Sequence, residues 1–141
     1  MEHSYCLGSQ YWSQNLHKPN YFAKYGILLD MVGGKDAIFT QELASVTFAP
    51  QVVKKVWNTA ASIGYENYFQ FQKTQLIIDD HLYINNLAQG RVPTIDIIEH
   101  DPSTESNFNK HWHTHDDNIE NIDKKTLKAV GQTVMQVVYS E

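Results

Sequence analysis

The clearest hydrophobic pattern lies at the carboxyl end of the chain. Apolar residues recur there at intervals of three and four, the spacing of a helix with one buried face. Asp123 directly precedes this stretch and is a typical N-cap, because its carboxylate can accept hydrogen bonds from the free N–H groups of the first turn. The pattern predicts an amphipathic helix whose apolar stripe is Leu127, Val130, Val134, Val137 and Val138.

Three further segments have helical spacing. Residues 51–64 carry apolar side chains at the same intervals, with Pro50 suited to the first turn and Gly64 to the carboxyl-terminal cap. Residues 5–15 show a weaker helical pattern, which Gly8 interrupts. Residues 81–87 could form a short helix before the next strand.

Short apolar runs predict two buried strands. Residues 25–32 form a continuous apolar run that two glycines close, and this length favours a strand over a helix. Residues 92–98 form the second run, with Pro93 near its start, where a missing N–H donor is tolerated. Residues 68–78 alternate only weakly, and residues 100–107 predict a polar loop.

Alternating strands and helices predict an α/β fold, a partial and mainly parallel sheet flanked by helices. Ligands of such sheets collect at the carboxyl ends of the strands. Asp30 ends the first strand, the pair Asp79 and Asp80 follows an apolar run, and His100 follows the second strand. We therefore expect the acidic and histidine side chains of three segments to lie at one edge of the sheet.

The composition is that of a folded chain with an acidic balance. The chain has 141 residues, so we expect a single domain over residues 1–141. Hydrophobic residues make up 42% of it, too many for a disordered protein. It has 11 Lys and Arg against 16 Asp and Glu, a net charge of −5, which argues against nucleic acid as the main partner.

No segment indicates a membrane span or an export signal. No apolar run approaches the roughly 18 residues of a membrane-spanning helix, so no membrane partner is expected. The first ten residues lack the basic and apolar regions of a signal peptide, and the localisation stays open. Cys6 is the single cysteine, so an internal disulfide is excluded.

The densest group of candidate ligands is His111, His113 and His115, followed by Asp116 and Asp117. In an extended backbone the three histidines would share one face. Imidazole is a common metal ligand, and a nearby carboxylate often orients it. Neighbouring histidines cannot easily all bind one ion, so this segment could supply one or two ligands. A polar loop with incidental histidines explains the spacing equally well.

Adjacent acids form the second candidate group. Asp79 and Asp80, followed by His81, could split their pKa values so that one carboxyl group carries a proton. The alternative is a helix start in which one of the acids is the N-cap. For Asp30 the alternative is a structural carboxylate that accepts backbone hydrogen bonds.

Three blocks of the chain resemble, in the same order, the carboxyl-terminal half of the zinc aminopeptidase and glutaminyl cyclase family. The blocks are ILLDMVGGKDAIF, LIIDDHLYINNLAQGRVPTIDII and FNKHWHTHDDNIENIDKKTL. The last is the most specific, because its WHTHDDNIENID run before an amphipathic helix is close to the glutaminyl cyclase signature. The resemblance covers nearly the whole chain and implies a phosphorylase/hydrolase-like zinc exopeptidase architecture.

The resemblance implies metal and acid roles for three residues. His113 matches the zinc-binding histidine of the family. Asp30 matches a carboxylate that binds the second metal in dizinc aminopeptidases and joins a hydrogen-bonded acid network in single-zinc cyclases. Asp79 matches the second acid of that network, so Asp30 and Asp79 are the implied catalytic acids. His111 and His115 match no ligand of the family.

The resemblance also implies substrate-binding residues. Asp80 and His81 match an Asp-His pair of the peptidases. Phe108 and Trp112 match aromatic residues that line the cyclase pocket, although large aromatic side chains more often belong to a core. Asp117 is the candidate that orients the zinc-binding histidine.

Other parts of the family's catalytic set do not match this chain. The family uses a metal-bridging Asp in a His-x-Asp element and an adjacent pair of glutamates, both upstream of the strand that ends in Asp30. The chain has no Glu-Glu dipeptide, and too few residues precede Asp30 to hold these parts. We therefore expect an incomplete domain, truncated at its amino-terminal side, with zinc in the complete enzyme and weak or absent in this chain. Complete relatives are often exported.

The resemblance implies an enzyme that acts on peptide N-termini. In a peptidase, metal-activated water attacks a peptide carbonyl and a glutamate moves the proton. In a cyclase, the substrate's own amine attacks its glutamine amide and ammonia leaves. The acid pair and the aromatic residues favour the cyclase, and the peptidase stays open. The alternative class is a non-catalytic module that binds a partner or another copy of itself, and the uncovered strand 25–32 predicts a homo-oligomer.

Overall fold

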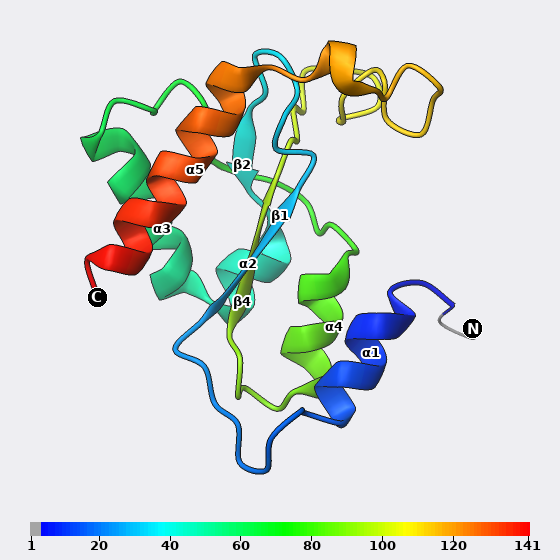
Figure 1. Ribbon diagram of the computed structural model, residues 1–141, viewed down its shortest axis with the longest axis vertical. Helices are drawn as coiled ribbons and strands as arrows, with labels where there is room; N and C mark the ends of the chain where they lie inside the picture. Colours follow the sequence, from blue (N-terminus) through cyan, green and yellow to red (C-terminus); the bar gives the residue numbers. More distant parts are fainter. Residues whose placement is uncertain (1–3) are drawn as a thin grey trace.

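The computed structural model describes residues 4–141 as an α/β fold (Figure 1). Residues 1–3, part of the segment in which no signal peptide is expected, lie outside the described residues. The strands are β1 (Gly26–Asp30), β2 (Phe39–Gln41), β3 (Phe69–Lys73) and β4 (Thr94–Ile98). The helices are α1 (Leu7–Gln14), α2 (Leu43–Phe48), α3 (Pro50–Ser62), α4 (Asp80–Leu87) and α5 (Lys124–Tyr139), with a 3-10 turn, η1, over Ile119–Asn121.

The strands form two parallel pairs. β1 pairs with β4 so that Asp30 lies opposite Ile98, and β2 pairs with β3. An antiparallel bridge between Phe39 and Glu99 connects the pairs. All of β4 is buried, whereas β1 is only partly buried and, within residues 4–141, pairs with β4 alone. β1 is therefore an edge strand of the described structure.

Helices cover both faces of β4. Ile95 and Ile97 belong to the core that α3 and α5 also form, while Thr94 and Asp96 alternate with them along the strand. The side chain of Asn85 in α4 bonds both the N–H and the carbonyl of Thr94, and α1 packs against α4 (Figure 1). The core cluster is Ala37, Phe39, Ala49, Val52, Val53, Val56, Trp57, Ala60, Phe69, Ile95, Ile97, Val130 and Val137.

The predicted fold class is confirmed, and the strongest helical signals correspond to helices. α3 occupies most of residues 51–64 and has Pro50 in its first turn. Gly64 follows it with a φ of 85°, a conformation that favours glycine. Asp123 caps α5 by accepting a hydrogen bond from the Lys125 N–H at 3.0 Å.

The apolar stripe of α5 is only partly buried. Val130 and Val137 lie in the core, whereas Leu127 is 43% exposed and Val138 is 48% exposed. The edges of the stripe stay accessible because only its centre packs against α3 and the core. No helix among the described residues has the length and apolar character needed to cross a membrane.

Two short elements are not evident from hydrophobic periodicity. β2 has three residues and α2 has six, too few to establish a period. α2 begins where the side chain of Glu42 accepts hydrogen bonds from the N–H groups of Ala44 and Ser45. The weakly alternating residues 68–78 form a strand only over Phe69–Lys73.

Phe69→Ala should lower the free energy of unfolding by about 3–5 kcal/mol, the usual cost of truncating a buried aromatic side chain. Phe69 is fully buried, and its ring lies 5.1 Å from that of Phe39 and 5.5 Å from that of Trp57. Urea denaturation measures the change. The matched control is Phe71→Ala in the same strand, where the side chain is 60% exposed and the cost should stay within about 0.5 kcal/mol. Equal losses in the two variants would contradict this core.

Candidate functional site

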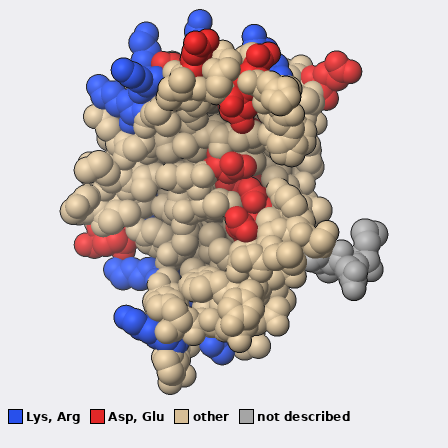
Figure 2. All heavy atoms as spheres, turned by 45° about the vertical axis from the view of Figure 1, so that its right-hand side comes forward, with Lys and Arg blue, Asp and Glu red and all other residues tan. Residues whose placement is uncertain are grey.

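Side chains from several distant segments line an open hollow at the carboxyl end of β1. Its volume is about 510 Å³, within the range of small-molecule sites. Acidic side chains gather in the middle of one face of the molecule (Figure 2). Six of the predicted site residues line this acidic hollow: Asp30, Asp79, Asp80, Trp112, His113 and Asp117.

Asp30 is the last residue of β1 and lies beside a second carboxyl group. Burial raises the pKa of Asp30, and the charge of Asp79 and a hydrogen bond with it raise the pKa further, against the effect of the Met31 backbone N–H. Two carboxyl groups that share a hydrogen bond must hold a proton between them. Asp30 is therefore harder to ionise than a free aspartate, because the carboxyl group of Asp79 lies beside it.

Asp79 is the N-cap of α4. Its Oδ1 accepts a hydrogen bond from the Asp80 N–H at 2.7 Å and lies 3.8 Å from the donating Sγ of Cys6. Burial raises the pKa of Cys6 to about 12, and the charges of Asp80 and Asp79 add to the shift, so the thiol keeps its proton and donates. The helix-cap interpretation is correct for Asp79, and it coexists with the contact to Asp30.

Packed aromatic rings form a wall beside the acids. The ring of Phe108 lies 5.0 Å from that of Trp112, and Trp112 stacks on the imidazole of His113 with 4.1 Å between ring centroids. Phe108 and Trp112 also line, together with Asp30 and Asp79, a second cavity that adjoins the acidic hollow. The wall therefore brings an apolar surface and an imidazole next to the acid pair.

The histidine-rich loop contributes one histidine to the acidic hollow. The loop turns rather than extends, since the Trp112 N–H donates to the Asn109 carbonyl at 2.9 Å and His113 has a φ of 59°. The extended backbone in which three histidines would share a face is not formed. His113 lines the hollow, whereas the exposed His115 does not, and His111 lines a different cavity.

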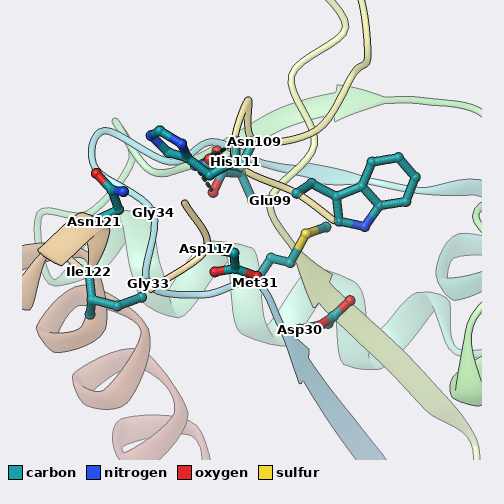
Figure 3. A pocket seen from close by; sticks show the side chains of 11 residues that line it. Asp30, Met31, Gly33, Gly34, Glu99, Asn109, His111, Asp117, Asn121 and Ile122 are labelled. Carbon is teal, nitrogen blue, oxygen red and sulfur yellow. Dashed lines mark hydrogen bonds between the residues drawn. The ribbon is translucent and has the colours of Figure 1, made fainter. Parts of the chain in front are cut away.

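That cavity, of about 190 Å³, shares Asp30, Trp112 and Asp117 with the acidic hollow (Figure 3). Its wall includes Glu99, which follows β4 and accepts two hydrogen bonds from the side-chain nitrogen of Asn109, at 2.9 and 3.1 Å. A Cβ atom on Gly34 would lie 2.1 Å from Glu99 Oε2, so the close approach requires glycine. Burial raises the pKa of Glu99. The sequence patterns do not indicate Glu99, because its partner lies in a separate loop.

His100 does not lie at the accessible edge of the sheet, where the sequence predicted it. Its buried ring packs against Phe108 of the aromatic wall. It is fully buried, its Nδ1 lies 3.0 Å from Thr40 Oγ1, and its Nε2 lies 3.2 Å from Gln75 Nε2. Its ring packs edge-on against Phe108 at 5.7 Å. Burial lowers the pKa of His100, which favours the neutral ring.

His81 does not line the acidic hollow with Asp80. Its side chain is fully buried, with Nε2 3.1 Å from Glu42 Oε1 and Nδ1 3.5 Å from Asp96 Oδ2. In the described structure His81 has no surface to offer a substrate, because its position in the first turn of α4 directs it toward α2 and β4. The substrate-binding role implied for His81 therefore does not fit this geometry.

The model of one protein family, described as Peptidase family M28, matches residues 1–138. The chain belongs to peptidase family M28. This result confirms the resemblance that the three sequence blocks indicated. Zinc is accordingly implied for the complete enzyme, since the family includes Zn-dependent exopeptidases. The comparison with curated proteins gave no match.

Solved structures of bacterial proteins superpose on nearly all of the chain. Tannerella forsythia glutaminyl cyclase is 48% identical, with a TM-score of 0.93 over 100% of this chain and 48% of its own. A Zn-dependent exopeptidase from Parabacteroides distasonis is 48% identical, with a TM-score of 0.94 and the same coverage. Bacteroides thetaiotaomicron glutaminyl cyclase is 54% identical, with a TM-score of 0.91 over 96% of this chain and 45% of its own. The chain thus spans about half the length of these relatives.

Asp96 is an acid near the site that the sequence analysis does not identify. It lies in β4, is fully buried, and neither of its carboxyl oxygens has a hydrogen-bond partner among the described residues. Burial raises the pKa of Asp96 to about 9, and the charges of Asp79, Asp30 and Glu42 add to the shift. The signal that could have identified it is a lone carboxylate inside the apolar run TIDII.

The free energy of unfolding of the Asp96→Asn variant should rise with pH relative to that of the original chain. Folded Asp96 keeps its proton up to about pH 9, whereas in the unfolded chain an Asp ionises near pH 4. The folded state therefore binds the extra proton between these values, and the original chain loses stability there as the pH rises. Asn cannot ionise, so the gain should increase from pH 4 to pH 8 by at most about 1.4 kcal/mol per pH unit. Urea midpoints at pH 4, 6 and 8 measure it, and a constant difference would contradict the assignment.

Proposed function

We propose that this chain is the carboxyl-terminal part of a zinc-dependent, glutaminyl cyclase-like enzyme that acts on peptide N-termini. The observation that carries the proposal is the meeting of two acids, Asp30 and Asp79, with the Phe108 and Trp112 rings and the imidazole of His113 around adjoining cavities. The similarity to two bacterial glutaminyl cyclases supports the same reaction.

His113 fits the zinc ion of the proposed cyclase, whereas Asp30 would bind a metal ion only in a dizinc peptidase. A carboxylate oxygen and an imidazole nitrogen are donors that zinc accepts, but protein zinc sites use three or four donors. The resemblance implies that the other donors are an Asp and a Glu upstream of β1 in the complete enzyme. Asp117 lines the same hollow and is the candidate that orients the imidazole. When bound, zinc polarises the carbonyl that is attacked.

The acid pair would move the proton in cyclisation. The substrate's N-terminal amine attacks its glutamine amide carbon, so the amine must lose a proton and the departing nitrogen must gain one to leave as ammonia. Asp79 would accept the first proton, and the pair of Asp79 and Asp30, which line the same hollow, would pass a proton to the departing nitrogen. Asp80 adds a negative charge that attracts the substrate's amino group, and the Phe108 and Trp112 wall packs against the glutamine methylenes.

An aminopeptidase is the second candidate. The Parabacteroides distasonis relative is a Zn-dependent exopeptidase, and a Bacteroides thetaiotaomicron structure, 51% identical to this chain, is that of a leucine aminopeptidase precursor. In that reaction water is the nucleophile, and Asp30 would bind a second metal ion. The products distinguish the two reactions, because a cyclase releases ammonia and a peptidase releases a free amino acid.

We further propose that residues 1–141 do not turn over substrate by themselves. The sequence contains no Glu-Glu dipeptide, which the resemblance implies as the source of the catalytic base and a zinc ligand. A general base contributes roughly 10²–10⁴-fold to such a reaction, and the missing donors weaken metal binding as well.

Combining the chain with the amino-terminal half of Tannerella forsythia glutaminyl cyclase should restore cyclisation of an N-terminal glutamine peptide. Ammonia release measures the rate. Asp79→Asn should lower it roughly 10²–10⁴-fold, as expected for loss of a proton-transfer group. His115→Ala is the matched control, because this exposed histidine lies in the same loop but not in the acidic hollow, and its rate should not change.

Three outcomes would contradict these proposals. Turnover by the chain alone, or retention of one zinc per chain after dialysis against a mild chelator, would show that residues 1–141 hold a complete site. Release of a free amino acid in place of ammonia would favour the aminopeptidase.

We also propose that the chain by itself forms a homo-oligomer through β1. The edge of β1 is unpaired within the described residues, and Leu29 on this strand is 45% exposed. An apolar strand edge offers free N–H and carbonyl groups that pair readily with another chain, most simply with a second copy about a two-fold axis.

Light scattering at micromolar concentration should give a dimer or a larger species. Leu29→Lys should shift the mass toward the monomer, because charge on an edge strand opposes strand pairing. Leu127→Lys is the matched control, since Leu127 is similarly exposed, at 43%, but lies on α5. A monomeric original chain would overturn the proposal.

A further inference from the structure

Glu42 is a fully buried carboxylate whose acceptor sites are all occupied. Oε1 accepts from the Ser45 N–H and lies 3.1 Å from the donating Nε2 of His81. Oε2 accepts from the Ala44 N–H at 2.8 Å and from the Ile77 N–H at 3.4 Å. Burial raises the pKa of Glu42, but the hydrogen bonds from His81 and Ser45 outweigh it and lower the pKa to about 2.

These contacts hold both sides of the corner at which α4 begins. Ile77 lies two residues before Asp79 and His81 lies two residues after it, so the carboxylate of Glu42 binds one flank with each oxygen. The cap bond of Asp79, to the N–H of the next residue at 2.7 Å, is local and cannot fix the corner relative to the sheet. That fixation must come from longer-range contacts such as those of Glu42.

The second ring nitrogen of His81 faces Asp96 in β4. Nδ1 of His81 lies 3.5 Å from Asp96 Oδ2, and both side chains are fully buried. The Asp96 N–H in turn donates to Ser45 Oγ at 2.9 Å. Hydrogen bonds therefore connect Glu42 with His81 of α4 and Ser45 of α2 with the backbone of β4, while the side chains of His81 and Asp96 are close without a hydrogen bond.

We propose that Glu42 is a positioning residue for Asp79, which it holds in reach of Asp30 by clamping the residues on either side of it through Ile77 and His81. The role of Asp79 in proton transfer rests on the proposed function, whereas the clamp itself is a property of this chain. Glu42 does not line the acidic hollow, so it acts through the backbone and not on a substrate.

Glu42→Gln tests the clamp with almost no change in volume. The amide replaces one oxygen by an NH2 group, and each oxygen of Glu42 faces at least one backbone N–H, that of Ser45 on one side and those of Ala44 and Ile77 on the other. In either orientation the variant therefore sets a donor against a donor. An unmade hydrogen bond of this kind is more costly than a lost contact.

Amide hydrogen exchange by NMR is the measurement. In Glu42→Gln the Asp80 and Leu82 amides, which bond to the side chain and the carbonyl of Asp79, should exchange roughly tenfold to hundredfold faster relative to the β4 amides, as expected for loss of a charged hydrogen bond. The side-chain carboxyl carbon resonance of Asp79 should also shift. Val137→Ala is the control: it destabilises a core distant from the corner and should leave both readouts unchanged after correction for global stability.

A pair of His81 variants tests the clamp if Glu42→Gln does not fold. His81→Leu removes the donor to Glu42 and should reproduce the local acceleration. His81→Gln can still donate from its amide nitrogen and should restore slow exchange. Acceleration of all amides together, or no rescue by His81→Gln, would overturn the proposal. Neither readout requires turnover, so local acceleration supports the clamp even if the combined enzyme proves inactive, a result that would contradict only the proposed function.

Discussion

The buried strand β4 is the constraint on which the rest of the structure depends. A parallel strand with all five residues buried must be covered by helices on both faces. Ile95 and Ile97 accordingly pack into the core with α3 and α5, while Thr94 and Asp96 contact residues of α4 and α2. Because β1 runs parallel beside β4, Asp30 and the loops after both strands emerge at the same edge. Residues from distant parts of the chain therefore meet in one hollow.

That edge concentrates negative charge. Asp30, Asp79 and Asp80 line one hollow, and their charges reach Asp96 inside the sheet. Each carboxylate disfavours ionisation of the others, and together with burial this raises the pKa of Asp30 and of Asp96. Crowded carboxyl groups are harder to ionise than isolated ones, and their negative charge attracts cations. This crowding of carboxyl groups also lowers the stability of the fold. The pKa of Glu42 is shifted in the opposite direction, because hydrogen bonds to both of its oxygens stabilise the charged form.

Hydrophobic spacing predicted the elements that are long enough to show a period, such as α3 and α5, and the continuous apolar runs that became β1 and β4. It could not predict β2 or α2, which are too short. Glu42 was not recognisable either, because it is a single acid whose partners Ile77 and His81 lie 35 and 39 residues away. The direction of His81 was equally undetermined, since one residue of a short helix start gives no period.

The sequence by itself determined the α/β class, the family and the caps of the long helices. These depend on residues that are close together along the chain, or on sequence motifs that can be recognised without the structure. The family resemblance already distinguished His113 from His111 and His115, but only the tertiary structure decided that His113 lines the same hollow as the acids. It also decided that the side chains of His81 and His100 are buried, and that Glu42 holds the corner of α4. These outcomes depend on which buried polar group finds a partner across the sheet, and that choice is made by packing between distant segments.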